Sequence, residues 1–478
     1  MEWKQLLCDD RIRSYRGKGS GDLRTEFEKD YHRIIQSASF RRLQDKTQVF
    51  PLDKSDFIRT RLTHSLEVSS YGKSLGQNIA QNIIKVIGDE SFLPEYAADI
   101  CDILQCAGLL HDIGNPPFGH FGETVIRDWF TKNLPELTYR GRRLTEVLTP
   151  QMLADFYQFE GNTQALRVVT KLHYLVDEHG MNLTKALLGT MIKYPVSSLE
   201  INKKSGDIKT KKMGYFYADR EIFTELQESL GTNGSRHPLS YILEAADDIA
   251  YLTADIEDAF KKGCISYMEL AQELERAEDA AAQKGIAPES IEEYHRMAAR
   301  LTDKYEKALK NGEDSPEMYA VQNWIVQVQG HLIASATAGF TGNYEAIMAG
   351  THTKELLFGT PGELMAQTLG DIAYRYAFIS KPILKLEIAA ENILNFLLES
   401  FVRAVIYYDT ETKLTGVQEK LIALISENYR TIYKRYSEGK SETEKLYLRL
   451  LLVTDDICGM TDSYAKRLYQ ELSGQWQG

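Results

Sequence analysis

Apolar residues recur at helical spacing along most of the 478-residue chain. Positions i, i+3 and i+4 are repeatedly hydrophobic, a pattern typical of amphipathic α-helices. The pattern predicts helices over residues 63–85, 96–110, 163–178, 239–260, 266–283, 288–310, 317–336, 384–407 and 416–435. Residues 196–218 lack it, which predicts an irregular loop or a hairpin. We therefore expect an all-α fold.

Composition divides these helices into three units. Residues 265–320 are rich in Glu, Lys, Ala and Arg, which favours a helical hairpin exposed to solvent. Apolar helices resume after this segment, so we predict units at 1–264, 265–320 and 321–478. The chain length agrees with several units, because single cores rarely grow beyond about 250–300 residues.

The acidic balance of the chain restricts how it can handle anions. Its net charge is -12 and its pI is near 5.5, so an anionic ligand needs a local concentration of positive side chains. Five cysteines without a CxxC pair favour reduced thiols. The N-terminus has no apolar signal segment, and no stretch approaches the roughly 18 apolar residues of a membrane span. We expect a cytoplasmic protein without membrane contact.

Residues 101–130 carry the strongest chemical pattern. An apolar helix runs directly into His111 and Asp112, whose side chains can reach one cation. The sequence GNPPFG then predicts a tight turn, and His120 follows His111 by nine residues. Glu123 lies three residues further, on the face of His120 if a helix begins there. An isolated His-Asp pair is often structural, so the pattern needs further ligands to indicate a metal site.

Further candidate ligands occur elsewhere in the chain. His64 lies on an amphipathic stretch, and Asp247 and Asp248 lie in an otherwise apolar helix. Carboxylates in such a place are costly unless they are paired or bind metal. Two histidines and two aspartates would suit Mn, Fe, Zn, Co or Mg. Four protein ligands leave positions for water and substrate, which indicates hydrolysis rather than a structural metal.

These motifs resemble a known family. His64, the His111–Asp112 pair and a distant aspartate are similar to the H…HD…D signature of the HD phosphohydrolases. Five strings resemble the dGTP triphosphohydrolase branch of that superfamily, and they span nearly the whole chain: KTQVFP (46–51), HDIGNPPFGHFGE (111–123), FEGNTQALR (159–167), EAADDIAYLTADIED (244–258) and GMTDSYA (459–465). The match is weaker after residue 265, apart from GMTDSYA.

The resemblance implies an HD-domain helical bundle in residues 1–264 with the metal at its centre. Residues 321–478 would then form an additional C-terminal helical unit that completes the nucleotide pocket and makes oligomer contacts. The family pattern places the ligand aspartate four residues before a tyrosine. It therefore selects Asp247, with Tyr251 and Asp255 on the same face, and leaves Asp248 facing another neighbour such as a basic side chain. Mn or Mg are the expected metals, with Fe, Co and Zn as alternatives.

The resemblance also implies a reaction, in which dGTP is cut at the α-phosphorus into deoxyguanosine and triphosphate. His120 would be the general acid or a proton shuttle, oriented by Glu123. Phosphate contacts would come from Arg61, Asn162, Lys193, Tyr194, Lys212 and Tyr251. Gln48 and Asp255 would bond the 3′-hydroxyl, while Val49 and Tyr251 would crowd C2′ and exclude ribose. Arg449 is a candidate reader of guanine, although a solvated helix arginine is the alternative.

Two other functions compete with this one. The chain could be a different HD phosphohydrolase, acting on other dNTPs, on nucleoside monophosphates or on a guanosine alarmone. It could also be a nucleic-acid-binding protein with a residual HD site. The resemblance further implies a homo-oligomer, a hexamer or a tetramer, and single-stranded DNA as a candidate partner.

Overall fold

The structure, a computed structural model, describes residues 1–13, 21–50, 57–173, 177–379 and 381–475. Within these ranges α-helices dominate, and the only sheet is a hairpin of β1 (Thr138–Tyr139) and β2 (Arg142–Arg143). The predicted all-α fold is confirmed. No helix in the described ranges is both long and apolar enough to span a membrane.

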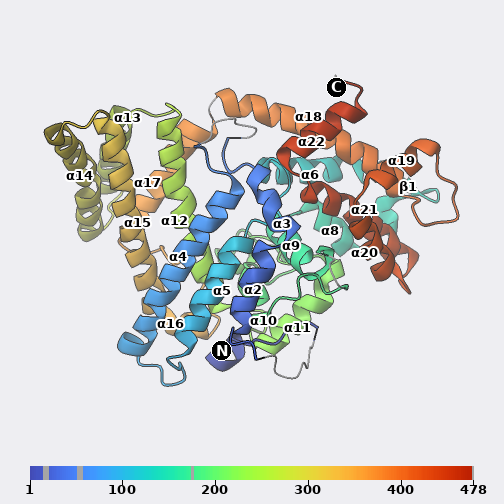
Figure 1. The fold of residues 1–478 in the computed structure, drawn as a ribbon, viewed down its shortest axis with the longest axis horizontal. Helices are drawn as coiled ribbons and strands as arrows, with labels where there is room; N and C mark the ends of the chain where they lie inside the picture. The colour runs from blue at the N-terminus through green and yellow to red at the C-terminus, as the bar shows by residue number, and fades with distance from the viewer. Residues whose placement is uncertain (14–20, 51–56, 174–176, 380, 476–478) are drawn as a thin grey trace.

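The helices are shown along the chain in Figure 1. In chain order they are α1 (Trp3–Leu6), α2 (Glu26–Ile35), α3 (Ala38–Arg41), α4 (Arg61–Asn82), α5 (Tyr96–Leu110), α6 (Gly119–Asn133), α7 (Leu144–Val147), α8 (Pro150–Tyr157), α9 (Gly161–Arg167), α10 (Lys185–Met191), α11 (Arg220–Leu230), α12 (Pro238–Lys261), α13 (Tyr267–Gln283), α14 (Pro288–Asn311), α15 (Pro316–Gly342), α16 (Tyr344–Met348), α17 (Glu363–Ala373), α18 (Lys381–Val405), α19 (Gly416–Leu424), α20 (Glu427–Ser437), α21 (Glu442–Gly459) and α22 (Asp462–Leu472).

Three helices form the centre of the fold. α4 packs along α5, and α12 packs on both of them (Figure 1). α4 begins at a capping box, in which the Thr60 side chain and backbone exchange hydrogen bonds with those of Thr63. This cap fixes the first turn of α4, which carries Arg61 and leads into His64. The metal-binding pattern of the sequence therefore lies on the best-packed helices of the molecule.

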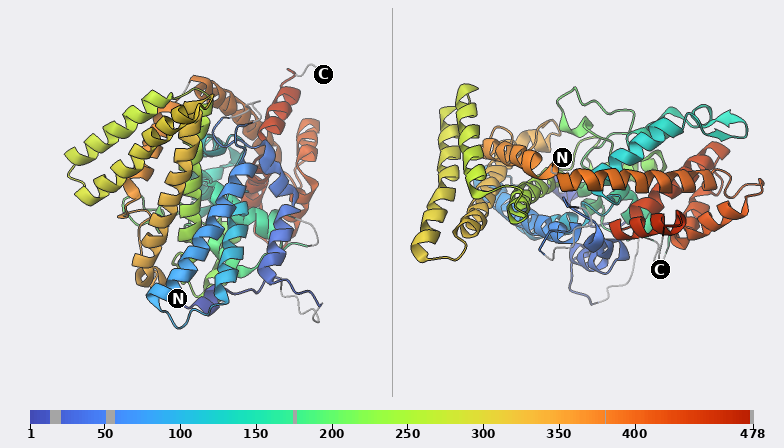
Figure 2. Two further views of the ribbon diagram at one scale, coloured as in Figure 1. Left: turned by 60° about the vertical axis from the view of Figure 1, so that its left-hand side comes forward. Right: turned by 90° about the horizontal axis from the view of Figure 1, so that it is seen from above.

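The two ends of the molecule are built differently. α13 and α14 contact each other at one end, and α14 packs on α15, which joins them to α12. At the other end the long helix α18 contacts α6, α19, α21 and α22 (Figure 2). α18 thereby ties the C-terminal helices to α6, the helix that follows the His111–Asp112 turn. The predicted division into units at 264 and 320 stays a prediction.

Most predicted helices lie close to the observed ones, but two do not. The helix expected over 163–178 is α9 followed by a π-helical turn, Val168–Leu172, and residues 174–176 lie outside the described residues. The helix expected over 416–435 is broken between α19 and α20, where Ile425 is extended and the Ser426 N–H donates to Asp456 Oδ1 at 3.0 Å. Residues 196–218 form a loop with two short 3-10 turns and, as described, no strand, so the hairpin alternative is wrong.

Candidate active site

Three side chains from separate helices meet at the centre of the fold. His64 comes from α4, His111 follows α5, and Asp247 comes from α12. His64 Nε2 lies 3.1 Å and His111 Nε2 lies 3.4 Å from Asp247 Oδ1. The ligating atoms of the three residues all lie within 4.8 Å of one another. We call this group the His–His–Asp cluster.

One ring nitrogen of the cluster, His111 Nε2, is open toward a metal, whereas His64 faces Asp247 with Nε2. His111 Nδ1 lies 2.7 Å from the carbonyl oxygen of Gly108, so it carries the proton and leaves Nε2 as a lone-pair donor. His111 Nε2 and His64 Nδ1 are both buried without a hydrogen-bond partner among the described residues. Buried polar atoms rarely stay unsatisfied. Two imidazoles and a carboxylate with open donor atoms fit a divalent cation of the first transition series or Mg.

Asp112 lies at the edge of this cluster. Its Oδ2 is 3.6 Å from His111 Nε2, but the same oxygen accepts a hydrogen bond from the Arg61 guanidinium. Its other oxygen accepts from Asn115 Nδ2 at 2.6 Å. The carboxylate therefore lies beside His111, where Arg61 and Asn115 fix its orientation, and its role as a metal ligand stays a prediction.

The GNPPFG segment forms a turn that packs closely against the Arg61 side chain. Phe118 and Gly119 both adopt left-handed backbone conformations, with φ of 63° and 61°, and α6 begins there. A Cβ on Gly119 would lie only 2.3 Å from an Arg61 guanidinium nitrogen. The absence of a side chain at Gly119 therefore lets the buried Arg61 reach Asp112.

The helix expected at Glu123 is α6, and it pairs this residue with His120. His120 Nδ1 lies 3.2 Å from Glu123 Oε2, and the His120 side chain is 76% exposed whereas that of Glu123 is 2% exposed. Glu123 Oε1 accepts the Gly161 N–H at 2.7 Å, which fixes the carboxylate from behind. The hydrogen bond and charge of Glu123 raise the pKa of His120. The imidazole is thus open to a ligand and biased toward its charged form.

The two lysines predicted to bind phosphate lie in different places. Lys193 Nζ lies 3.0 Å from Asp247 Oδ2 and is buried, next to the buried Tyr194. Burial disfavours its charge, but the carboxylates of Asp247 and Glu244 outweigh it and raise the pKa of Lys193. Lys212 Nζ lies 2.8 Å from Glu160 Oε2. The structure therefore brings Lys193 to the cluster itself.

Lys212 belongs instead to the neighbourhood of His120. Its partner Glu160 directly precedes Gly161, whose N–H is bonded to Glu123. Lys212 is close enough to His120 for its charge to lower the pKa of that imidazole slightly against the effect of Glu123. Asn162, half-buried, follows in the first turn of α9.

The other face of the site is formed by α12. Asp247, Tyr251 and Asp255 follow one another by one helical turn each. Burial raises the pKa of Asp255 to about 7. Asp248 is not in the cluster, and burial followed by the charges of Glu244 and Asp247 raises its pKa well above the usual range. Of the two acids that the apolar pattern left open, Asp247 is the one that meets the histidines.

Gln48 and Val49 lie at the end of the described segment 21–50. Val49 is buried, and Gln48 Oε1 is buried without a hydrogen-bond partner among the described residues. Pro51, the last residue of the KTQVFP string, lies outside the described residues. The amide oxygen of Gln48 therefore has a hydrogen-bonding capacity that no described protein group uses.

The structure does not bring Arg449 into any of these contacts. Its guanidinium is buried and donates to the carbonyl oxygens of Tyr408 at 2.9 Å and Lys445 at 3.3 Å. It also lies over the ring of Tyr139, 5.2 Å from the centroid. It is therefore not a solvated helix arginine, and its role as a reader of guanine stays a prediction.

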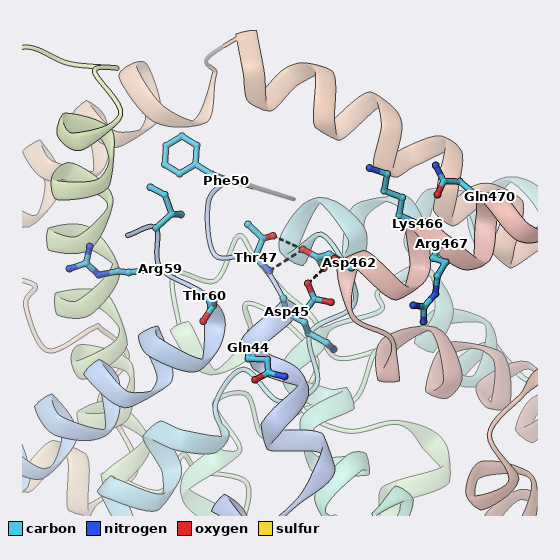
Figure 3. A pocket seen from close by; sticks show the side chains of 13 residues that line it. Gln44, Asp45, Thr47, Phe50, Arg59, Thr60, Asp462, Lys466, Arg467 and Gln470 are labelled. Atoms are coloured by element: carbon cyan, nitrogen blue, oxygen red, sulfur yellow. Dashed lines mark hydrogen bonds between the residues drawn. The ribbon is translucent and has the colours of Figure 1, made fainter. Parts of the chain in front are cut away.

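The GMTDSYA string, to which sequence reasoning gave no role, joins two parts of the site. Asp462 Oδ2 accepts the Thr47 N–H at 3.0 Å, and Asp462 Oδ1 accepts the Phe118 N–H at 2.9 Å. Figure 3 shows Asp462 against Thr47 beside a cavity of about 380 Å³. Lys46 Nζ adds bonds to the carbonyl oxygens of Asn115 and Cys458, both at 2.6 Å. Asp462 and Lys46 thus hold the Gln48 segment and the GNPPFG turn together.

Comparison with known proteins agrees with this geometry. A family model described as an HD domain matches residues 61–177, which include His64, His111 and Asp112 but end before Asp247. The fold and the paired histidines define the chain as an HD-domain protein.

Relatives that match the full length of the chain identify its family within the HD-domain proteins. The chain is 51% identical over 480 residues to the deoxyguanosinetriphosphate triphosphohydrolase-like protein of Listeria monocytogenes, covering 99% of this chain and 100% of the relative. It is 33% identical over 486 residues to the like-named protein of Synechocystis, covering 99% of each. It is 32% identical over 490 residues to the deoxyguanosinetriphosphate triphosphohydrolase of Yersinia pestis, covering 93% of each. The chain belongs to the deoxyguanosinetriphosphate triphosphohydrolase family, which confirms the resemblance and the expectation of a hydrolase.

Proposed function

We propose that the chain hydrolyses dGTP, with other dNTPs as further substrates, into the deoxynucleoside and triphosphate. The name of the Yersinia relative supports the substrate and the reaction. The observation that carries the proposal is the His–His–Asp cluster, in which His111 Nε2 is unpartnered among the described residues and lies beside buried cationic side chains. His64, His111, Asp112 and Asp247 would hold a divalent metal. When bound, this metal would polarise a phosphoryl oxygen and lower the pKa of a bound water.

The basic side chains around the cluster would bind the phosphates. Arg61 and Lys193 already face the carboxylates of Asp112 and Asp247, so a phosphate at the metal would meet both cations at once. Lys212 and Asn162, next to the His120 side, would hold the outer phosphates, with Tyr194 and Tyr251 as further contacts. Each of these cations is already paired with a carboxylate, so a bound divalent metal would have to supply the additional positive charge that a polyanion needs.

His120 would supply the proton that the departing 5′-oxygen needs. Its side chain is exposed and its pKa is raised by Glu123, so the charged, proton-donating form persists to higher pH than for a free histidine. Glu123 is itself fixed by the Gly161 N–H, which orients the imidazole. A shuttle role, in which His120 first positions the nucleophile, would use the same contacts.

Selection of the sugar would come from residues of the Gln48 segment and of α12. Gln48 and Asp255 would bond the 3′-hydroxyl, and Val49 with Tyr251 would crowd C2′. Overpacking costs about 1–3 kcal/mol, so we expect dGTP to be preferred over GTP by about tenfold or more. Equal turnover of the two nucleotides by the purified protein would contradict this steric reading.

The test of the proposed function is product analysis. The purified protein is incubated with Mn or Mg and each of the four dNTPs, and the products are separated by ion exchange. Deoxynucleoside with intact triphosphate is the expected result, whereas diphosphate or pyrophosphate would indicate a different HD phosphohydrolase. A filter-binding assay with single-stranded oligonucleotide, run beside it, tests the proposed partner. Gel filtration with light scattering tests the proposed hexamer or tetramer.

A further inference from the structure

A second group of cationic side chains lies outside the candidate active site. A cavity of about 360 Å³ is lined by Arg13, Arg33, Arg41 and Arg42, together with His173 and parts of residues 177–182 and 426–429. We call it the arginine pocket. None of the residues proposed for metal, phosphate or sugar binding lines it.

The charges of the arginine pocket are not balanced from within. Of the described residues that line it, Asp177 is the one acid, and it pairs with Arg13. The other three guanidinium groups donate to neutral oxygens: Arg33 to the Met181 carbonyl at 3.3 Å, Arg41 to the Gln36 carbonyl at 2.7 Å and Arg42 to the Tyr429 hydroxyl at 3.4 Å. Such contacts orient a guanidinium without neutralising it.

One group in the pocket responds to the positive charges that line it. Burial, and then the charges of Arg42 and Arg41, lowers the pKa of His173. Arg33, Arg41 and Arg42 are exposed side chains that line this cavity, so an anion in it can approach their guanidinium groups. In a chain with a net charge of -12, a local concentration of cations of this kind favours an anionic ligand.

We propose that the arginine pocket binds an oligophosphate anion, either free or as the phosphate tail of a nucleotide. Arginine forks bind phosphate oxygens two at a time, and several of them around one cavity match several phosphates. The volume lies in the range of about 300–1,000 Å³ that is usual for small-molecule sites. A nucleic acid would instead need cationic and aromatic side chains along an extended groove. The proposal does not depend on turnover, although triphosphate is also the product of the proposed reaction.

The experiment is calorimetric titration of the full chain with inorganic triphosphate in the presence of EDTA. Chelation removes the metal contribution of the active site and prevents turnover, so a failure of the proposed function leaves this result unaffected. Arg33→Ala/Arg42→Ala removes the two weakest-bonded arginines, and we expect it to reduce triphosphate affinity by about tenfold or more. Arg33→Lys/Arg42→Lys keeps the charge and should lose less. Arg300→Ala, an exposed arginine on α14, is the matched control and should change nothing.

Further measurements test whether this binding is independent of the active site and whether the ligand is a nucleotide or a phosphate chain. Lys193→Ala should retain the arginine-dependent binding. If dGTP binds at this site more tightly than triphosphate, the ligand is a nucleotide; if the two bind equally, it is the phosphate chain alone. Wild-type affinity in the double variant, with an unchanged thermal melt, would overturn the proposal. So would an equal loss in Arg300→Ala, or arginine-dependent binding of single-stranded oligonucleotide without binding of triphosphate.

Discussion

Two groups of buried charged side chains in this molecule differ in how their charges and hydrogen-bonding atoms are paired. In the first, which we call the Arg167 network, Arg167 Nε and a terminal nitrogen donate to the two oxygens of Asp455 at 2.7 and 2.8 Å, and Lys171 lies 2.8 Å from Asp219. The His–His–Asp cluster is equally buried, but it leaves His64 Nδ1 and His111 Nε2 without partners.

The difference indicates what each group is for. The Arg167 network pairs each cation with a carboxylate, so its charges balance, and the oxygen that lacks a described partner, Asp219 Oδ2, belongs to a carboxylate that is already paired with Lys171. A buried pair of this kind is costly to break, although it does not by itself add much stability. The His–His–Asp cluster brings His64, His111 and Asp247 close enough to hold one cation, and His111 Nε2 has no partner within the described part of the protein. Replacing one acid in the His–His–Asp cluster should therefore reduce mainly turnover, and replacing one acid in the Arg167 network should reduce mainly the free energy of unfolding.

The largest effect is expected for Asp247→Ala. This change removes the carboxylate that meets both histidines, so turnover should fall by about 1,000-fold or more, which corresponds to about 4 kcal/mol of lost transition-state stabilisation. Metal content, measured by mass spectrometry of the purified protein, should fall as well, and EDTA should reproduce the loss in the wild type. Asp303→Ala, an exposed acid on α14, is the control. A metal-loaded, active Asp247→Ala protein would remove the basis of the proposed site.

The matching change in the Arg167 network is Asp455→Ala. It leaves a buried guanidinium without its bidentate partner, which should lower the free energy of unfolding by about 3–5 kcal/mol. Denaturant titration measures this loss, with the exposed Asp128→Ala as the control. The folded fraction should keep its metal. If Asp455→Ala lost metal at unchanged stability, the two groups would not be separate.

A smaller effect is expected at His120. Its imidazole is exposed and makes no contact with the cluster in the described structure, so His120→Ala should retain metal while kcat falls by about 100-fold. Steady-state kinetics and metal analysis on the same preparation make the distinction. Normal turnover would exclude His120 as the proton donor.

The smallest effect is a change in pH dependence for Glu123→Gln. Glu123 raises the pKa of His120, and a proton donor is active only while protonated. Activity should therefore be lost as pH rises through the pKa of His120. Without the Glu123 charge this limb should move to lower pH, and exposure of the imidazole to solvent limits the shift. The rate–pH profile measures the shift, and an unmoved high-pH limb would assign it to another group.

The sequence predicted the parts of the site that lie on regular helices. His64, His111 and Asp247 could be found because apolar periodicity makes buried polar residues conspicuous, although choosing Asp247 over Asp248 needed the family resemblance. Arg449 shows the limit of this reasoning. Helical spacing does not tell which residues of a distant loop a side chain will meet, and its contacts with the Tyr408 carbonyl and the Tyr139 ring depend on chain packing.

The same limit applies to helix ends and to joints between segments. The break at Ile425 coincides with a contact to Asp456 from α21, which local propensity does not contain. Glu160, the partner of Lys212, and Lys46, the donor to Asn115, were also not recognised as parts of the site. Their roles depend on carbonyl and carboxylate groups that the fold brings close to them, and the sequence alone does not show these contacts.

One such joint has a consequence for how the protein is made. Asp462 begins α22 near the C-terminal end, yet it accepts the backbone N–H groups of Thr47 and Phe118. During synthesis, the HD motif leaves the ribosome long before the residue that fastens its turn. A nascent chain therefore cannot fix this turn until Asp462 has been made, and a proteolytic cut just before Asp462 should lower activity although His64, His111, Asp112 and Asp247 all remain in the chain.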